Sequence, residues 1–340
     1  MSGAMNNVNE AGTPRTPPLI APLAERDLPE ARRIVRTAFG TFIGVPDLET
    51  FWTDRDYVYG RWHAPHVATF GASIGGSLVG SNFATKWGSV GVFGPLSVRP
   101  DLQERGIAKA LLAATMDQFD AWGTTHNGLF TFPHSAKHVA LYQKFGFHAR
   151  FLTAVMTLIA RQMGLARQTG LARQTGPIPG TSRFSALSDT EQAAALRASR
   201  EVTETLYPGL DLSGEIATVA SQGLGDTVLL DGDDGLAGFA ICHHGPRSEA
   251  GQDVCFIKFG AVRVTPMADR DFGRLLDACE ALAVSVGMKV LMAGTNLARH
   301  EAYQHLLARG FRTAFQGVHM HQRNESGYCR PGLYVIDDWR

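Results

Sequence analysis

The most informative stretch of the chain is LSVRPDLQERGIAKALL, residues 96–112. In it an apolar run ends at Val98, a polar loop carries a single glycine, Gly106, and an amphipathic helix follows to about Trp122. Glycine in a first helical turn costs up to about 1 kcal/mol relative to alanine, so its presence indicates that another group approaches the backbone closely. The N-terminus of a helix has unpaired N–H groups and a partial positive charge, which together attract phosphate. Gly106 and the small residue Ala108 therefore predict a phosphate site at the start of this helix.

A second segment, SAKHVALYQKFGF, covers residues 135–147 and has the pattern of a helix that ends at Gly146. The two segments together resemble the acetyl-CoA motif and the second signature of the GNAT superfamily of N-acetyltransferases. The matching residues are Gln103, Gly106 and Ala108 in the first motif and Leu141, Tyr142, Lys144, Gly146 and Phe147 in the second. Ser135 stands where asparagine is usual, and His138 stands where a small residue is usual. The resemblance extends over residues 19–159.

The resemblance implies an acetyl-CoA-dependent N-acetyltransferase in which a primary amine attacks the thioester directly. It implies these cofactor-binding residues: Leu96, Ser97, Val98, Gln103, Glu104, Arg105, Gly106, Ile107, Ala108 and Ser135. The N–H groups of residues 103–108 would hold the pyrophosphate, and the pantetheine would pair with residues 96–98 as an added strand. An N–H near Leu96 or Ser97 would polarise the thioester carbonyl.

Tyr142 matches the tyrosine that protonates the leaving thiolate in this family. A phenol with an ordinary pKa of about 10 stays protonated at neutral pH, as a general acid must. The alternative is that Tyr142 is an aromatic residue packed in the core.

The general base stays unassigned. Family members often use a carboxylate on the strand before the loop, but the strand predicted over residues 89–98 has neither Asp nor Glu. The candidates are His134, after the next strand, and Glu49, Asp54, Asp56, His63 and His66, around a helix predicted over residues 48–62. The spacing of His134 and His138 lacks the glutamate of an HExxH zinc site, so no metal is expected.

The second half of the chain repeats the first at a constant offset. Leu111-Leu112 recurs as Leu275-Leu276, and Gly146-Phe147 recurs as Gly310-Phe311 in the same ungapped register. Matches in one register across this length indicate a tandem duplication of one fold.

The repeat differs at the residues that would bind and use the cofactor. At the same offset Gly106 becomes Arg270, Ala108 becomes Phe272 and Tyr142 becomes Leu306, while Asp269 and Asp271 add negative charge. Bulk and like charge both oppose phosphate binding. We therefore expect the second copy to keep the fold and to have lost the cofactor. Because the second copy carries arginine there, we also expect an arginine at position 106 to leave the fold intact.

The predicted fold class is α+β, with two tandem GNAT domains, each a mixed, mostly antiparallel sheet flanked by helices. Four segments are expected. They are a disordered tail over residues 1–17, a catalytic, acetyl-CoA-binding domain over residues 18–160, a linker over residues 161–181 and a degenerate domain over residues 182–340. The linker is expected because its composition changes abruptly and a hexamer repeats directly within it.

The amino-acid composition limits the kinds of partner and environment that we expect. The 340 residues include 32 basic and 32 acidic side chains, so the net charge is zero and nothing indicates a nucleic-acid partner. No apolar run reaches the length of a membrane span. The four cysteines lack CxxC spacing, which argues against zinc and disulfides and favours the reducing cytoplasm.

The acceptor cannot be identified from the residues. A small-molecule amine is the first expectation, a protein acceptor stays open, and a homodimer is possible. Two alternatives also stay open: a non-catalytic protein that binds or senses acyl-CoA, and an acyltransferase with another acyl donor.

Overall fold

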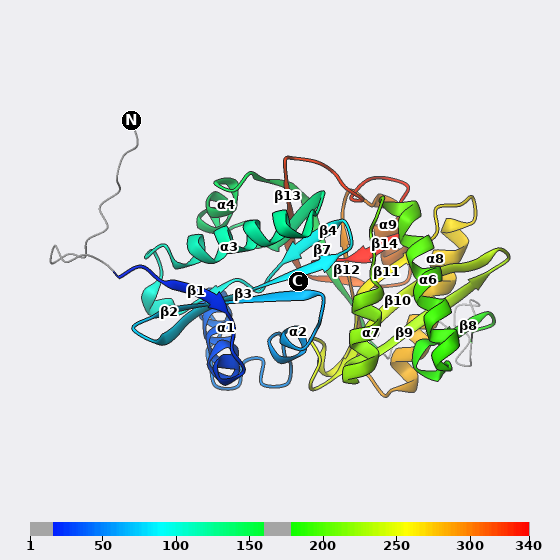
Figure 1. The fold of residues 1–340 in the computed structure, drawn as a ribbon. Helices are drawn as coiled ribbons and strands as arrows, with labels where there is room; N and C mark the ends of the chain where they lie inside the picture. The colour runs from blue at the N-terminus through cyan, green and yellow to red at the C-terminus, as the bar shows by residue number, and fades with distance from the viewer. Residues whose placement is uncertain (1–15, 160–177, 340) are drawn as a thin grey trace.

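The computed structural model describes residues 16–159 and 178–339. They form one continuous 14-stranded sheet that runs through both halves of the chain and is flanked by helices (Figure 1). Most neighbouring strands are antiparallel, which confirms the predicted α+β class. Most of the predicted tail and most of the predicted linker lie outside the described residues. Within the described residues, no helix is long and apolar enough to cross a membrane.

The first half is built from the following elements: β1 (Leu19–Pro22), η1 (Glu25–Asp27), α1 (Leu28–Ile43), α2 (Tyr59–Trp62), β2 (Val67–Ile74), β3 (Ser77–Trp87), β4 (Val90–Phe93), β5 (Ser97–Val98), η2 (Pro100–Leu102), α3 (Ile107–Trp122), β6 (His126–Thr131), α4 (Ala136–Gln143) and β7 (Phe147–Ile159). Two predictions were wrong. The helix predicted over residues 48–62 is only the single turn α2, because residues 48–54 form turns tied to Arg36 through the carbonyls of Leu48, Glu49 and Phe51. The strand predicted over residues 89–98 is interrupted at residues 94–96.

The second half follows a similar order, with the single strand β11 in place of β4 and β5 and with β14 added at the end: β8 (Thr181–Arg183), η4 (Phe184–Ala186), α6 (Asp189–Leu206), α7 (Ser213–Gln222), β9 (Gly225–Gly232), β10 (Gly235–Gly245), β11 (Gly251–Val262), α8 (Ala268–Ser285), β12 (Val290–Asn296), α9 (His300–Ala308), β13 (Arg312–Gln322) and β14 (Val335–Asp337). The register repeats as well. In β4 and β6, Val90 pairs with His126, and in β11 and β12, Val254 pairs with Val290. Both partners are displaced by the same offset that relates the two halves in the sequence.

The two halves exchange a strand. The sheet order is β4-β6-β13-β7-β12-β11, so β13 of the second half lies between β6 and β7 of the first. The exchange is reciprocal, because β7 lies between β13 and β12. Its registers are symmetric too: Thr131 pairs with Val318, and the residues equivalent to these two in the repeat, Thr295 and Ala154, also pair with each other.

The exchanged strands complete the cores of the opposite halves. Val318 and Met320 of β13 pack with Phe93 and Leu129 of the first half. In the other direction, Ala154, Met156 and Leu158 of β7 pack against α8 in the core of the second half. Each core therefore buries apolar side chains from the other half of the chain. Burial of apolar surface is the main favourable contribution to folding.

Candidate active site

The start of α3 is open to solvent, as the phosphate prediction requires. Gly106 is the N-cap, with a left-handed φ of 79°, and no side chain caps the helix there. The first N–H that bonds back to the helix is that of Ala110, which donates to the carbonyl of Gly106 over 3.0 Å. A Cβ at Gly106 would meet nothing within 4 Å. The N–H groups of residues 107–109 therefore point into accessible space next to the exposed side chains of Arg105 and Lys109.

The two sequence motifs meet at this helix end. Lys137, in the first turn of α4, donates a 2.7 Å hydrogen bond from Nζ to Oε1 of Gln103 and lies 3.8 Å from Glu104. Ser135 is the N-cap of α4, and its carbonyl accepts the N–H of Val139. The fold thus brings the predicted loop residues and the start of the second motif to one surface, with a lysine ammonium between them.

The interruption after β4 opens one edge of the central sheet. β4 pairs with β6 in parallel up to Phe93 and Leu129 and then leaves it, and β5 pairs only with β3 among the described strands. Arg99 donates its N–H to the carbonyl of Val79 over 2.9 Å. Because alternate residues of a strand bond to opposite sides, Ser97 faces β3 with Arg99, whereas the backbone groups of Leu96 and Val98 face the open edge. The register thus favours Leu96 over Ser97 as the N–H donor to a ligand beside β5.

Tyr142 is buried and packs against Phe93, the last residue of β4 before the opening. Its ring centroid is 5.8 Å from that of Phe93, and the ring belongs to the apolar cluster under α3 and α4. Burial raises the pKa of the phenol to about 12, although a hydrogen bond with Thr131 opposes the shift. The phenol therefore holds its proton throughout the neutral range.

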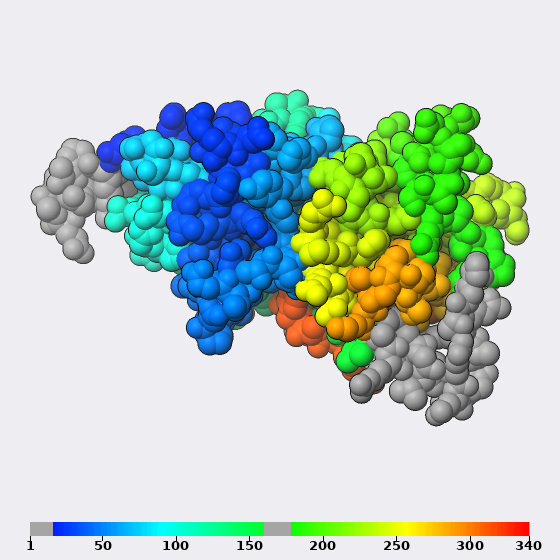
Figure 2. All heavy atoms as spheres, turned by 90° about the horizontal axis from the view of Figure 1, so that it is seen from below, coloured from blue at the N-terminus to red at the C-terminus, as the bar shows by residue number. Residues whose placement is uncertain are grey.

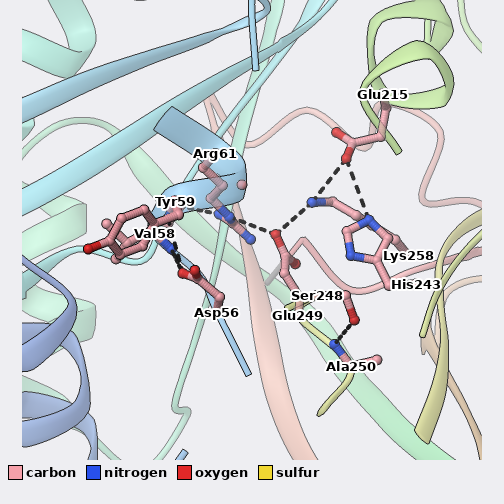
Figure 3. A network of polar contacts seen from close by, with 12 residues as sticks. Asp56, Val58, Tyr59, Arg61, Glu215, His243, Ser248, Glu249, Ala250 and Lys258 are labelled. Carbon is pink, nitrogen blue, oxygen red and sulfur yellow. Dashed lines mark hydrogen bonds and ion pairs between the residues drawn. The ribbon is translucent and has the colours of Figure 1, made fainter. Parts of the chain in front are cut away.

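A small cavity, with room for about one water molecule, lies between the two halves and is lined by a buried network of charges (Figure 3). Nε of Arg61 donates to Oε1 of Glu249 over 2.8 Å, and Nζ of Lys258 lies 2.8 Å from the same oxygen. Nζ of Lys258 also lies 3.1 Å from Oε1 of Glu215, and Nε2 of His66 lies 3.0 Å from Oε2 of the same carboxylate. These five side chains come from both halves, so neither half alone forms the cavity.

The two carboxylates of the network stay ionised. Burial alone would raise the pKa of Glu249, but the charges of Arg61 and Lys258 outweigh it and hold the pKa at about 2. Lys258 and His66 likewise hold the pKa of Glu215 well below its ordinary value in spite of burial. Arg61 also donates to the carbonyl of Gly94, where β4 leaves β6, so the network adjoins the open edge of the sheet.

The comparisons with known proteins agree with this geometry. Residues 31–147 match the family model described as the acetyltransferase (GNAT) family. This segment is a GNAT acetyltransferase domain. It contains every residue predicted to bind the cofactor, together with Tyr142.

Solved structures extend the likeness to both halves. A putative acetyltransferase from Pyrococcus horikoshii aligns over 95% of each chain with a TM-score of 0.63 and 13% identity. A GCN5-related N-acetyltransferase from Sphaerobacter thermophilus aligns with a TM-score of 0.56 and 12% identity, over 90% of this chain and 95% of its own. A tandem GNAT protein from the clavulanic acid biosynthesis pathway aligns with a TM-score of 0.53 and 15% identity, over 89% of this chain and 98% of its own. At these identities the likeness concerns the fold. No curated protein sequence matches the chain.

The equivalent helix end of the second half is filled by side chains. Helix α8 begins at Ala268, about one turn earlier than α3, so Arg270 lies inside a helix and not at a left-handed N-cap. Asp269 accepts hydrogen bonds from His305 and from the Tyr334 hydroxyl. Phe272 is fully buried, and its ring packs against those of His305 and Tyr334, so side chains cover the first turn of α8.

The candidate general bases of the GNAT domain have other contacts. Asp56 accepts the N–H groups of Val58 and Tyr59, and Asp54 accepts the N–H of Gln252. His66 belongs to the buried network. His134 is exposed and stacks on Phe42 of α1 with centroids 5.6 Å apart. Sequence reasoning missed Arg61, Glu215, Glu249 and Lys258, because only the assembled sheet brings them together.

Segments of the two halves also meet at the surface beside the cavity. Figure 2 shows the blue segments of the GNAT domain directly against the yellow segments of the second half. Asp56 donates its N–H to the carbonyl of Ser248 over 3.0 Å there. The second half therefore forms part of the wall around the site.

Proposed function

We propose that the protein is an acetyl-CoA-dependent N-acetyltransferase that transfers acetyl to a small primary amine by direct attack on the thioester. Residues 103–108 hold the pyrophosphate, and Ser135 lies beside it at the start of α4. The open edge of β5 pairs with the pantetheine through Leu96 and Val98, next to Ser97. Acetyl-CoA serves as co-substrate, and the reaction as proposed needs no metal.

The observation that supports this proposal best is the uncapped start of α3. An N-cap glycine with open space above it, three unpaired N–H groups and flanking lysine and arginine side chains make a site for an anionic group. The equivalent position in the second half is blocked. We therefore place the cofactor in the GNAT domain and give the second half a structural and pocket-forming role.

The acceptor would bind over the small cavity between the halves, beside the point where the sheet opens. Arg61 lines the cavity and donates to the carbonyl of Gly94 at that opening, whereas the cavity itself has room for about one water molecule. Its buried carboxylates are balanced by Arg61 and Lys258, so the lining is not strongly acidic. This balance favours a small amine over a polycation or a protein segment.

The chemical step needs a proton donor for the thiolate and polarisation of the thioester carbonyl. The N–H of Leu96, on the open side of β5, would polarise the carbonyl oxygen. As the amine attacks and the carbon–sulfur bond breaks, the Tyr142 phenol would give its proton to the departing sulfur. The proton that the amine loses goes to a base that we do not assign.

A second candidate function is binding of acyl-CoA without catalysis. The burial of Tyr142, which is only 7% exposed, favours it, because a proton donor has to reach the sulfur. An acyl donor other than acetyl-CoA also stays open. The buried free cysteines support action in the cytoplasm, where thiols remain reduced.

The test is release of free thiol from acetyl-CoA in the presence of a panel of small amines, amino acids, polyamines and peptides. The proposal expects turnover with at least one small amine. Tight CoA binding without turnover on any amine would favour a non-catalytic protein that binds acyl-CoA. Turnover with a longer acyl-CoA, but not with acetyl-CoA, would show that the acyl donor is not acetyl-CoA.

A further inference from the structure

Three buried histidines and a cysteine gather where the exchanged strand β13 meets β6. His319 and His321 lie two residues apart on β13 and so face the same side of the sheet. His126 begins β6, and Cys329 lies in the segment between β13 and β14. Their side chains are at most 3% exposed. They lie on the face opposite the cluster under α3, which Val318 and Met320 enter.

The spacing of these side chains suits one small cation. Nδ1 of His319 lies 3.7 Å from Sγ of Cys329, and single ligand atoms of His319, His321 and Cys329 all lie within 4.8 Å of one another. Sulfur and nitrogen atoms bound to the same tetrahedral zinc ion lie about 3.6 Å apart. The ring of His126 is 5.0 Å from that of His321, centroid to centroid, and so lies next to the group.

Several ring nitrogens of these buried histidines also lack the hydrogen-bond partners that buried polar atoms normally have. Within the described residues, both ring nitrogens of His126 and the Nε2 atom of His321 have no hydrogen-bond partner. A buried polar group that stays unpaired destabilises the folded state. The other nitrogen of His321, Nδ1, lies 2.8 Å from the carbonyl of Glu325. A donor bond there leaves the Nε2 lone pair free, which is the arrangement typical of metal-bound histidine.

We propose that His319, His321 and Cys329 bind a zinc ion, with His126 as the fourth ligand. Imidazole and thiolate ligands suit zinc and exclude magnesium and calcium, which prefer oxygen. Four protein ligands in a closed, buried site make the ion structural. The sequence pattern contained no zinc motif, because His126 lies in the first half of the chain and the other ligands lie near its end.

The ion would fasten the strand exchange. It would join β6 of the first half to β13 and to the C-terminal segment. That segment already lies close: a Cβ at Gly327 would come within 2.5 Å of His126, and a Cβ at Gly128 would overlap the Trp339 ring. Trp339 also stacks on His319, with centroids 4.2 Å apart. The Trp339 ring covers one face of His319, and a metal would bind at the ring edge, where the nitrogen atoms lie.

The experiment measures metal content and thermal stability of the full chain. The protein is stripped with a chelator, incubated with zinc, desalted and analysed by elemental mass spectrometry. We expect one zinc ion per chain and a higher melting temperature with zinc than without it. The Cys329→Ala variant should retain less than a tenth of the zinc that the wild-type protein retains. Cys279→Ala, a change at another buried cysteine, should bind zinc as the wild type does.

A second readout covers the case in which Cys329→Ala does not fold. Cobalt added to the stripped wild-type protein should give the absorption of tetrahedral thiolate-bound Co²⁺. Wild-type protein that keeps no zinc after desalting, or shows no thiolate–cobalt absorption, would overturn the site. Full zinc binding by a folded Cys329→Ala variant would overturn it as well.

Discussion

Lys137 and Gln103, which lie 34 residues apart in the sequence, are joined by a 2.7 Å hydrogen bond at the start of α3. This bond places an ammonium group beside the unpaired N–H groups of the helix. A phosphate bound there would compete for the lysine, because charge-assisted bonds to anions are stronger than a bond to a neutral amide. Lys137 was not among the residues predicted from the sequence to bind the cofactor.

Replacing Lys137 with alanine should weaken CoA binding roughly tenfold, about 1.4 kcal/mol, because one charged donor to the phosphates is lost. Titration calorimetry at low and high salt would measure the loss, which should shrink as salt screens the charge. Lys144→Ala, an exposed change at the other end of α4, is the control. Equal affinities of Lys137→Ala and Lys144→Ala would remove Lys137 from the site.

Tyr142→Phe should lower kcat at least tenfold and leave the Kd of CoA nearly unchanged, if the phenol protonates the leaving thiolate. The variant loses the Thr131 hydrogen bond, so a stability cost of about 1 kcal/mol is expected as well. Stopped-assay kinetics and calorimetry on the same preparation separate the two effects. An unchanged kcat would show that Tyr142 is not the proton donor and serves only in packing the core.

The same tyrosine makes a prediction about stability in alkali. Because burial raises the pKa of the folded phenol to about 12, the folded state keeps its proton to higher pH than the unfolded state does. The stabilisation is complete below pH 10 and is lost as the pH rises toward 12. Denaturant unfolding of the wild type should show this decline, and Tyr142→Phe should show a smaller one.

Glu249→Gln should destabilise the protein by about 3 kcal/mol, because Arg61 and Lys258 lose a buried counter-charge. The pKa of Glu249 is held at about 2, so its stabilisation is present above about pH 4.5 and is lost as the pH falls toward 2. Denaturant unfolding between pH 2 and 7 would show a shallower acid decline for the variant. Glu201→Gln, in an exposed pair with Arg263, is the control and should change little.

Residues 16–159 expressed alone should not give a stable monomer. Without β13, the strand β6 keeps only β4 as a neighbour, and β7 loses both β13 and β12. Unpaired strand edges favour association. Size-exclusion chromatography with light scattering should show oligomers or aggregates, and co-expression with residues 178–340 should restore a 1:1 complex. A well-folded monomer of the first half would show that the exchange is dispensable.

Local sequence predicted much of the fold and part of the site. The loop before α3 and the Gly-Phe after α4 are local patterns, and the constant offset between the halves reappears in the pairing of Val90 with His126 and of Val254 with Val290. The exchange of β7 and β13 could not be predicted, because alternation along a strand specifies its buried face and not which neighbour it pairs with.

The rest of the site depends on long-range contacts. Arg61 and Glu249 are 188 residues apart and meet only when both halves are assembled. Gly94-Pro95 marks the break after Phe93 in the sequence. The break was missed because residues 90–98 are otherwise apolar nearly throughout and resemble one strand. The expectation that arginine would be harmless at position 106 is also corrected. Arg270 is helical, whereas Gly106 has a φ of 79°, where other residues are strained by about 1–2 kcal/mol.

If CoA binds at the open start of α3, an arginine at position 106 should prevent binding. Gly123→Arg is the matched control, because both glycines border α3 and have positive φ, and a Cβ at either would meet nothing within 4 Å. Both variants should lose similar stability. Titration calorimetry with CoA should give wild-type affinity for Gly123→Arg and at least a hundredfold loss for Gly106→Arg. Equal, wild-type affinities of the two variants would contradict the account.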